Sequence, residues 1–350
     1  MIHKYLKQAV SFVACSYCAF IFCYFILRLI FWDRLWIVAL IGTLSPLIFL
    51  PTLLLPFIGF LIIKNRWFSI ISSIACILLL SWLHLKYFSP ETTSIAGSQP
   101  SLKILSHNVG WYATQSPTIV KLIEREQPDI IFLQEIVRKH TLRAFRMLKA
   151  EYPYQIGTPP VGILSKYPIV SSEILHLANH QETQQRAIMK FQNREIVIYN
   201  MQATGPWFRI YKFLKFIKIP VYKYEKRAPE IQDLVERIQR ETLPVIAAGD
   251  FNMTDETQDY YRVQQVLQDA FLKAGWGFGF TWPNGFYPRR INMKLSYPVC
   301  RIDYIWHSKD WGDRSSSVLE AAESDHLPVA AELVLLSAVK REKLVYNIKS

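Results

Sequence analysis

The first 83 residues are nearly continuous in apolar side chains, whereas the rest of the chain alternates between short apolar runs and polar segments. Three apolar stretches, over residues 9–31, 35–63 and 67–83, are predicted as membrane-spanning helices, because a span needs about 20 apolar residues. A signal peptide is a poor alternative for the first stretch, since its apolar part is too long and two more stretches follow.

The second predicted span contains three prolines, Pro46, Pro51 and Pro56. A lipid-embedded helix tolerates proline because neighbouring helices can satisfy the freed backbone carbonyls. We expect the prolines to kink this span, and a re-entrant segment is the alternative.

Beyond the apolar region, residues 89–101 are rich in Ser, Thr, Pro and Gly and are predicted to be a linker. Residues 102–338 are predicted to form one domain, and residues 339–350 a basic C-terminal tail. Apolar runs in this domain follow strand and helix periods in mixed order. Strands are predicted over residues 102–109, 129–133, 162–167, 169–177, 186–191, 195–202, 245–248, 299–307, 317–323 and 329–335, and helices over 117–126, 229–240 and 257–270.

The mixture of hairpin-like and helical connections predicts the fold class. It favours an α/β sandwich, in which two packed mixed β-sheets are flanked by helices, over a doubly wound parallel sheet. Composition agrees with a membrane region joined to a soluble domain. Hydrophobic residues make up 51% of the chain, and this excess is concentrated in the first 83 residues.

Charge adds the expected membrane orientation. Lys4 and Lys7 precede the first span, and Lys64 and Arg66 separate the second from the third. The loop after the first span holds one arginine beside an aspartate, at positions 33 and 34. Because cationic flanks prefer the cytoplasm, we expect a cytoplasmic N-terminus and a domain on the extracytoplasmic, periplasmic side.

Acidic and amide side chains recur where the predicted strands begin or end. They lie in Gln134-Glu135, Gly249-Asp250-Phe251-Asn252, Arg301-Ile302-Asp303-Tyr304 and Ser324-Asp325-His326. Each motif alone is also typical of a turn or a cap. Together they indicate a cation site, because carboxylates are too costly to bury repeatedly without a partner. Oxygen ligands of this kind suit Mg²⁺.

Six motifs in this order resemble the signature of the endonuclease/exonuclease/phosphatase superfamily, in a membrane-anchored form of bacterial type. They are Asn108, Gln134-Glu135, Gly162 to Ile169, Gly249 to Asn252, Arg301 to Tyr304 and Ser324 to His326. The resemblance covers residues 102–336. It implies a four-layered α/β sandwich and hydrolysis of phosphoesters with Mg²⁺ or Mn²⁺.

The resemblance also implies roles for single residues. Glu135 would bind the metal, with Asn108 and Asp325 assisting. Asp250 would orient or deprotonate the attacking water, and Asn252 would donate a hydrogen bond to the phosphorus oxygens.

A histidine and several polar groups are expected to contact the phosphate. His326, held in its tautomer by Asp303, would contact a phosphate oxygen. Arg186 matches an arginine that often faces the phosphate, and Asn108 is a further candidate.

The chain departs from the family pattern at one position. In Tyr199-Asn200-Met201-Gln202, Gln202 replaces a histidine that many members carry. Glutamine can hydrogen-bond a phosphate but cannot shuttle a proton at neutral pH, so the acid for the leaving group is open. Asn200 and Gln202 are secondary phosphate-binding candidates.

Residues 207–227 interleave seven Lys or Arg with seven aromatic residues. Such a pattern suits a nucleic-acid groove or an interfacial helix on anionic lipid. An ordinary surface helix is the alternative. The upstream spans favour lipid contact.

Two function classes follow. The first is a membrane-anchored, Mg²⁺- or Mn²⁺-dependent phosphodiester hydrolase acting on nucleic acid or a phospholipid headgroup. The second is an inactive hydrolase-like membrane protein that binds a phosphorylated ligand or partner, an alternative motivated by Gln202.

Overall fold

The structure is a computed structural model that describes residues 2–90, 100–110, 116–136, 139–213, 217–223, 225–285, 296–320 and 323–336. Most of the predicted linker and the predicted tail 339–350 lie outside the described residues. The chain divides into two compact units. One contains residues 1–89, 208–222 and 256–258, and the other contains the remainder. We call them the helical unit and the catalytic unit.

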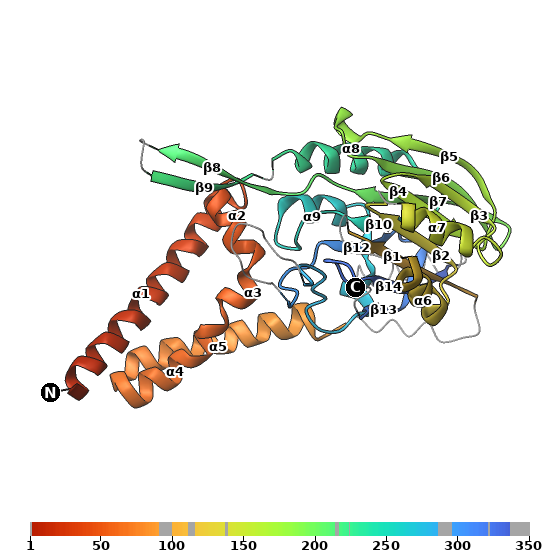
Figure 1. Cartoon of the computed structure of the whole chain (residues 1–350). Coiled ribbons are helices and arrows are strands. Elements are labelled where there is room, and N and C mark those ends of the chain that lie inside the picture. Colours follow the sequence, from red (N-terminus) through yellow and green to blue (C-terminus); the bar gives the residue numbers. More distant parts are fainter. Residues whose placement is uncertain are drawn as a thin grey trace. The chain divides into compact units, whose positions relative to one another are not determined.

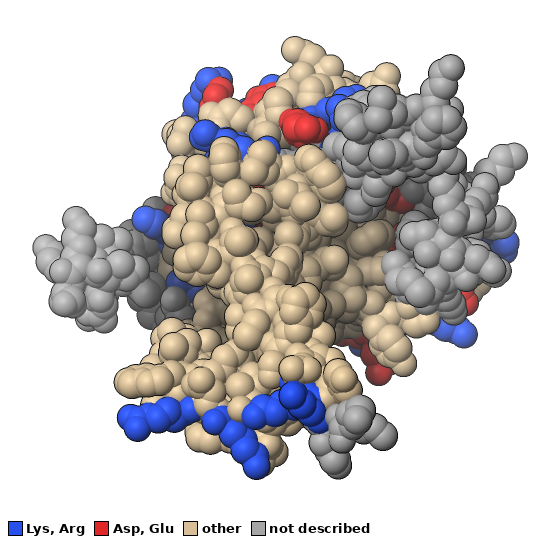
Figure 2. Space-filling view, turned by 90° about the vertical axis from the view of Figure 1, so that its left-hand side faces the viewer, with Lys and Arg blue, Asp and Glu red and all other residues tan. Residues whose placement is uncertain are grey.

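The helical unit contains three helical segments long and apolar enough to cross a membrane, Lys4–Phe31, Ser45–Ile63 and Arg66–Tyr87. The first and third are the continuous helices α1 (Ile2–Phe31) and α5 (Arg66–Tyr87). Figure 2 shows a wide band of neutral side chains, with Lys and Arg gathered along its lower edge.

The second predicted span is a series of short helical pieces. They are α2 (Trp36–Thr43), α3 (Ser45–Ile48), η1 (Leu50–Leu54), α4 (Leu55–Phe57) and η2 (Ile58–Ile63). Pro46, Pro51 and Pro56 each lie in the first two positions of a piece. The breaks follow because proline has no N–H to donate and clashes with the preceding turn.

Residues 207–227 differ from the helical expectation. They contain a two-stranded sheet of β8 (Trp207–Phe213) and β9 (Ile217–Lys223). The side chains of residues 207–222 lie outside the described residues. The segment ends in Arg227, the first residue of α8 (Arg227–Arg240), whose side chain is buried.

The catalytic unit contains two six-stranded mixed sheets (Figure 1). The first has the order β13-β14-β1-β2-β4-β3. Its strands are β1 (Ser101–Asn108), β2 (Ile130–Gln134), β3 (Tyr154–Thr158), β4 (Val161–Ser165), β13 (Trp311–Val318) and β14 (Val329–Leu335). Strands β1 and β2 are parallel, so their carboxyl ends share one edge.

The second sheet has the order β11-β12-β10-β7-β6-β5. Its strands are β5 (Ile169–Leu175), β6 (Gln184–Phe191), β7 (Arg194–Gln202), β10 (Val245–Asp250), β11 (Gln268–Asp269) and β12 (Asp303–His307). Strands β7 and β10 are parallel, and β12 runs antiparallel beside β10.

Three clusters of buried apolar residues show that the unit has four layers. One cluster joins the facing sides of the two sheets, through residues such as Ile104 and Ile246. A second packs α8 and α9 (Gln258–Gln264) on the second sheet. A third packs α6 (Ser116–Glu126) and α7 (Lys139–Met147) on the first. The predicted α/β sandwich is therefore confirmed.

Several predicted boundaries were wrong. The helix predicted over 257–270 is the short helix α9, followed by β11 and α10 (Ala270–Ala274). The strand predicted over 317–323 lies earlier, as β13. Helix α7 and strand β3 were not predicted, because their apolar residues are few and neither has a continuous apolar run.

Candidate active site

The sheet faces that meet in the core change from apolar to polar at one edge. On β1 the inward residues run Leu102, Ile104, Ser106, Asn108, and on β10 they run Ile246, Ala248, Asp250. Strands β2 and β7 end in the same way, at Gln134 and Gln202. The period of two places these polar ends on the face shared by both sheets. The candidate site is thus the polar edge of the intersheet core.

Asp250 is positioned by the close packing of β10 against its neighbours. Its register partners are Asp303 on β12 and Gln202 on β7. The preceding Gly249 has a φ of 146°, and a Cβ there would lie 2.1 Å from the Met201 carbonyl oxygen. Only glycine permits this approach. Asp250 is therefore delivered to the site by an unusually tight strand pair.

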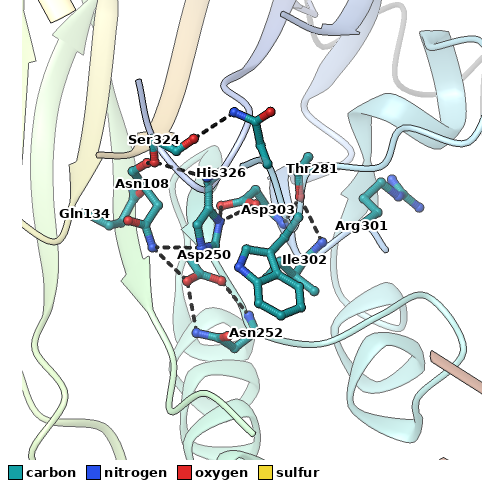
Figure 3. Close-up of polar contacts among 12 residues, drawn as sticks. Asn108, Gln134, Asp250, Asn252, Thr281, Arg301, Ile302, Asp303, Ser324 and His326 are labelled. Carbon is teal, nitrogen blue, oxygen red and sulfur yellow. Dashed lines mark hydrogen bonds and ion pairs between the residues drawn. The ribbon is translucent and has the colours of Figure 1, made fainter. Parts of the chain in front are cut away.

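His326 is held on one side by Asp303. Its Nδ1 lies 2.9 Å from Asp303 Oδ2, and its Nε2 lies 3.5 Å from Asn108 Nδ2 (Figure 3). A carboxylate at Nδ1 fixes the orientation of the imidazole and leaves Nε2 towards the cluster. This is the His-Asp pairing expected from the sequence motifs.

Asn108 joins two of the acids. Its Nδ2 donates to Glu135 Oε1 at 3.1 Å and to Asp250 Oδ2 at 3.0 Å. Its Oδ1 accepts from the Gly110 amide at 3.0 Å. In this arrangement Asn108 is a donor that holds the acids together, rather than an oxygen ligand for a cation.

Asn252 supports Asp250 from the other side. Its backbone N–H donates to Asp250 Oδ1 at 2.9 Å, and its Nδ2 donates to Asp250 Oδ2 at 3.0 Å (Figure 3). Asn252 has a φ of 51° and Glu135 a φ of 58°. Left-handed backbone is costly for residues other than glycine and gathers at functional sites.

The burial of so many charges shifts their pKa values. Burial is the main cause that raises the pKa of Asp250 to about 8, and the carboxylates of Asp303 and Glu135 add to it against the opposing effect of His326. Burial alone would lower the pKa of His326, but Asp303, Asp250 and Asp325 outweigh it and raise the pKa to about 10. The histidine is therefore an imidazolium among acids.

The cluster fits a hard divalent cation. A carboxylate oxygen of Asp250 and one of Asp303 lie within 4.8 Å of each other, whereas the protonated His326 beside them has no lone pair to offer a metal. Glu135 shares the Asn108 amide with Asp250 and contributes to raising the Asp250 pKa. A cation would stabilise the ionised carboxylates, which burial disfavours. The structure thus gathers three acids here, Asp250, Asp303 and Glu135. The metal ligands predicted from the sequence were Glu135, Asn108 and Asp325.

The structure places the other predicted residues as follows. Gln202 Nε2 donates to Asp250 Oδ2 at 3.3 Å, so Gln202 belongs to the cluster. Asp325 lies near His326, whose pKa it raises, and its Oδ1 would be 2.9 Å from a Cβ on Gly110.

Two predicted phosphate-binding residues have other partners. Asn200 is fully buried, and its amide bonds to Gln134, Gln185 and two backbone carbonyls. It links the two sheets and is committed to protein partners. The Arg186 guanidinium bonds to both carboxylate oxygens of Glu241, at 2.6 and 2.9 Å, and to Glu173. The structure does not bring Arg186 into the cluster.

Three supporting residues were missed in the sequence. Ser324 Oγ donates to the Asn108 carbonyl at 2.7 Å and accepts from the His326 amide at 3.1 Å. Thr281 Oγ1 accepts from the Asp303 amide at 3.3 Å, and Arg227 donates to the Asn252 carbonyl. Only Ser324 had a signal, because it lies inside the Ser-Asp-His motif.

A comparison with models of protein families identifies one family. A family model described as "Endonuclease/Exonuclease/phosphatase family" matches residues 105–326. The search of curated proteins found no match.

Among solved structures, the endonuclease/exonuclease/phosphatase from Bacteroides vulgatus is similar, with a TM-score of 0.53 and 18% identity over 68% of this chain and 100% of its own. A mannosyl-6-phosphatase from Bacteroides thetaiotaomicron has a TM-score of 0.50 and 20% identity over 67% of this chain and 100% of its own. A humanized D. rerio TDP2 has a TM-score of 0.50 and 17% identity over 67% of this chain and 98% of its own. At these identities the likeness shows the fold.

Proposed function

This chain belongs to the endonuclease/exonuclease/phosphatase family, whose members are usually metal-dependent phosphoester hydrolases, and we propose that it is a membrane-anchored, Mg²⁺- or Mn²⁺-dependent phosphodiester hydrolase. The observation that carries the proposal is the contact of Asn108 with Glu135, Asp250 and His326 at the edge of the core. It joins acids, amide donors and an oriented imidazole in one place.

The metal would be held by Glu135, which contacts Asn108, with Asp325, the further acid near His326, assisting. When bound, a divalent cation neutralises phosphate charge and polarises a phosphoryl oxygen. The buried carboxylates supply the negative charge that selects a cation at this edge. Asp303 is engaged with His326, so its first role is to orient the imidazole.

Asp250 is proposed to orient the attacking water and to accept its proton. Its Oδ2 accepts from three side-chain amides, those of Asn108, Asn252 and Gln202. Three donors fix the plane of this carboxylate before the substrate arrives. Pre-organisation of this kind lowers the barrier because no group must turn during the reaction.

His326 is proposed to bind the phosphate as an imidazolium. Asp303 accepts from Nδ1, so the proton on Nε2 is available to a phosphoryl oxygen. Asn252 would add a neutral donor beside it. Positive charge and donors aimed at the oxygens on which charge develops provide the largest share of catalysis in such reactions.

The proposed substrate is a phosphodiester in nucleic acid or in a phospholipid headgroup, and the membrane helices favour the phospholipid. Residues 207–227 are proposed to contact the bilayer surface together with the three spans. Within that range Arg227 is excluded, because it is buried against Asp259 and Asn252.

The proposed topology has a cytoplasmic N-terminus and a periplasmic catalytic unit. Lys4 and Lys7 start α1, and Lys64 and Arg66 lie between η2 and α5. Helix α1, the broken span from α2 to η2 and helix α5 alternate in direction. These four cations therefore lie at the same end of the helical unit. Fusions of alkaline phosphatase to the C-terminus test the topology. An active fusion supports it, and an inactive one contradicts it.

Hydrolysis of bis-p-nitrophenyl phosphate by the full-length protein in detergent tests the activity. The native protein should hydrolyse it with Mg²⁺ or Mn²⁺, and His326→Ala should lose about 100-fold or more. His176→Ala is the matched control, because the His176 side chain is exposed and its Nδ1 lies 3.2 Å from the Glu182 carbonyl oxygen. Equal rates in all three proteins would refute the proposal. Cation binding without turnover in the native protein would instead support the ligand-binding alternative.

A further inference from the structure

A short segment of alternating glycine and aromatic residues directly precedes Thr281, which contacts Asp303 in the site. It runs Gly275, Trp276, Gly277, Phe278, Gly279, Phe280, and we call residues 276–280 the aromatic rim. No residue from 275 to 285 is charged. None of these rings has a role in the proposed hydrolysis, so their exposure needs a separate explanation.

The aromatic rim exposes large apolar surface. The Trp276 side chain is 71% exposed, which is high for a tryptophan. Phe278 and Phe280 are half-buried and stack in parallel, with ring centroids 5.0 Å apart and an interplanar angle of 12°. A cluster of exposed apolar rings marks an interaction surface, whereas a single exposed ring needs no such explanation.

Hydrogen bonds attach the aromatic rim to the strands that carry the catalytic groups. Directly after Phe280, Thr281 Oγ1 accepts from the Asp303 amide at 3.3 Å, and the Thr281 carbonyl accepts from Leu327 at 2.8 Å. Three residues on, Asn284 donates to the carbonyls of Asp325 and Ser324, at 2.7 and 2.8 Å. Figure 3 shows Thr281 beside Ile302 and Asp303. The residues that directly follow the rim are therefore bonded to the backbone beside both partners of the His326–Asp303 pair.

The chemistry of the rim favours lipid over nucleic acid. Platforms that stack bases combine aromatic rings with cations that follow the phosphate backbone, and residues 275–285 contain no cation. Tryptophan and phenylalanine without charge partition into the membrane interface. The two ring types thus fit the boundary between headgroups and acyl chains.

A short covalent tether joins the catalytic unit to helix α5. Thirteen residues separate Tyr87, the end of α5, from Ser101, the start of β1. Fully extended, they span at most about 45 Å. The catalytic unit therefore works at a high local concentration of lipid headgroups if α5 crosses the membrane.

From these observations we propose that the aromatic rim is an interfacial binding site that inserts into the lipid surface and holds the apolar part of a membrane phospholipid substrate, with its phosphodiester at the His326–Asp303 pair. This inference rests on the proposed hydrolase function and names its substrate class. The occupant is a phospholipid in a bilayer.

The test uses full-length protein reconstituted into vesicles of phosphatidylethanolamine, phosphatidylglycerol, cardiolipin and sphingomyelin. Two rates are compared, release of phosphorylated headgroup or phosphate from the vesicles and hydrolysis of bis-p-nitrophenyl phosphate in solution. In Trp276→Ser/Phe278→Ser/Phe280→Ser the ratio of vesicle rate to soluble rate should fall about tenfold or more. Trp276→Ser alone, which changes an exposed side chain, should lower it about threefold.

Two matched variants serve as controls. Trp276→Phe keeps an apolar ring and should leave the ratio within about twofold of the native value. Tyr154→Ser removes an exposed aromatic ring on β3, away from the rim, and should also leave it unchanged. Quenching by brominated phospholipid should be weaker in Trp276→Phe than in the native protein, because the inserted indole is gone.

Three results would overturn the inference. One is a ratio that is unchanged in the single and the triple variant. Another is hydrolysis of a single-stranded DNA oligonucleotide that depends on the rim while no lipid is hydrolysed. The third is hydrolysis of the soluble diester without attack on any vesicle lipid, which would leave the hydrolase function intact and reject only the lipid substrate. If the native protein hydrolysed neither the vesicle lipids nor the soluble diester, the hydrolase function itself would be refuted.

Discussion

Gly249 lies against the Met201 carbonyl so closely that a Cβ on Gly249 would stand 2.1 Å from that oxygen. This contact joins β10 to β7 one residue before Asp250. Because the next residue is the centre of the acid cluster, the packing of two strands and the placement of the Asp250 carboxylate depend on the same position.

We expect Gly249→Ala to destabilise the catalytic unit by about 2–3 kcal/mol or more, since backbone rather than a flexible side chain meets the new methyl group. Turnover should fall with it, because Asp250 must shift. The midpoint of thermal unfolding and the rate of diester hydrolysis measure the two effects. Gly157→Ala is the control, because its Cβ would lie 3.5 Å from Phe145, an ordinary contact. A native melting temperature in Gly249→Ala would contradict this account.

Asp303→Asn should lower kcat by about 100- to 10,000-fold with little change in KM, because the imidazole loses the group that orients it and favours its charge. Steady-state kinetics on the soluble diester measures both constants. The chain provides a second buried pair on β12, His307 Nε2 with Asp313 Oδ1 at 2.9 Å. Asp313→Asn should keep kcat within about threefold, because that pair is outside the cluster. Equal losses in the two variants would show that Asp303 acts only through stability.

Glu135→Gln should weaken Mn²⁺ binding about tenfold or more, since one carboxylate charge is removed from the proposed cation site. Titration followed by electron paramagnetic resonance of free Mn²⁺ measures the affinity independently of turnover. Glu195→Gln, a change at an exposed position on β7, should not alter it. Chelation of the native protein should abolish hydrolysis, and Mg²⁺ or Mn²⁺ should restore it. Unaltered Mn²⁺ affinity in Glu135→Gln would exclude Glu135 as a ligand.

Arg186→Met should lower stability by about 1 kcal/mol at neutral pH and leave turnover within about twofold, because Arg186 pairs with Glu241 rather than with the cluster. Burial opposes ionisation of Glu241, but the hydrogen bonds from Arg186 and Tyr199 outweigh it and hold its pKa below the usual value. A lowered carboxyl pKa means that the pair stabilises the protein above about pH 4.3. This contribution disappears as the pH falls through the folded-state pKa.

The difference in melting temperature between native protein and Arg186→Met should therefore shrink at acid pH. Arg240→Met is the control, because its pair with Glu236 is exposed and long, at 3.9 Å. A raised KM for the diester in Arg186→Met, with native stability, would show that Arg186 binds the substrate phosphate.

Local patterns predicted much of the fold. The apolar runs of β1, β2 and β10 gave correct strands within a few residues, because a buried strand needs a continuous apolar run. The same reasoning placed α6 and α8. It missed α7 and β3, and it placed a helix where residues 207–223 form two strands. An alternation of basic and aromatic residues is compatible with a helix or with a strand. The pairing of β8 with β9 determines that this segment forms strands.

Most residues of the site were predicted, including the Asp303–His326 pair that the family resemblance implied, and the fold supplied the other contacts. Sequence motifs identified Glu135, Asp250, Asp303 and His326, because acids and imidazole at strand ends have few purely structural uses. They ranked Asn108 above Asn200 but kept both as phosphate-binding candidates, whereas in the structure Asn108 contacts the acids and Asn200 is enclosed between the sheets. Both are buried asparagines near the end of an inward-facing column, and only their hydrogen-bond partners distinguish them.

The sequence by itself therefore determined the apolar spans, the alternating strands and the polar residues at their ends, since these depend on hydrophobic period and residue chemistry over a few positions. Tertiary structure alone decided that Arg186 turns to Glu241 and that Thr281 joins the aromatic rim to the site. Those contacts join residues 22 to 55 positions apart. Strand register and sheet packing bring such residues together, and neither is encoded in a local pattern.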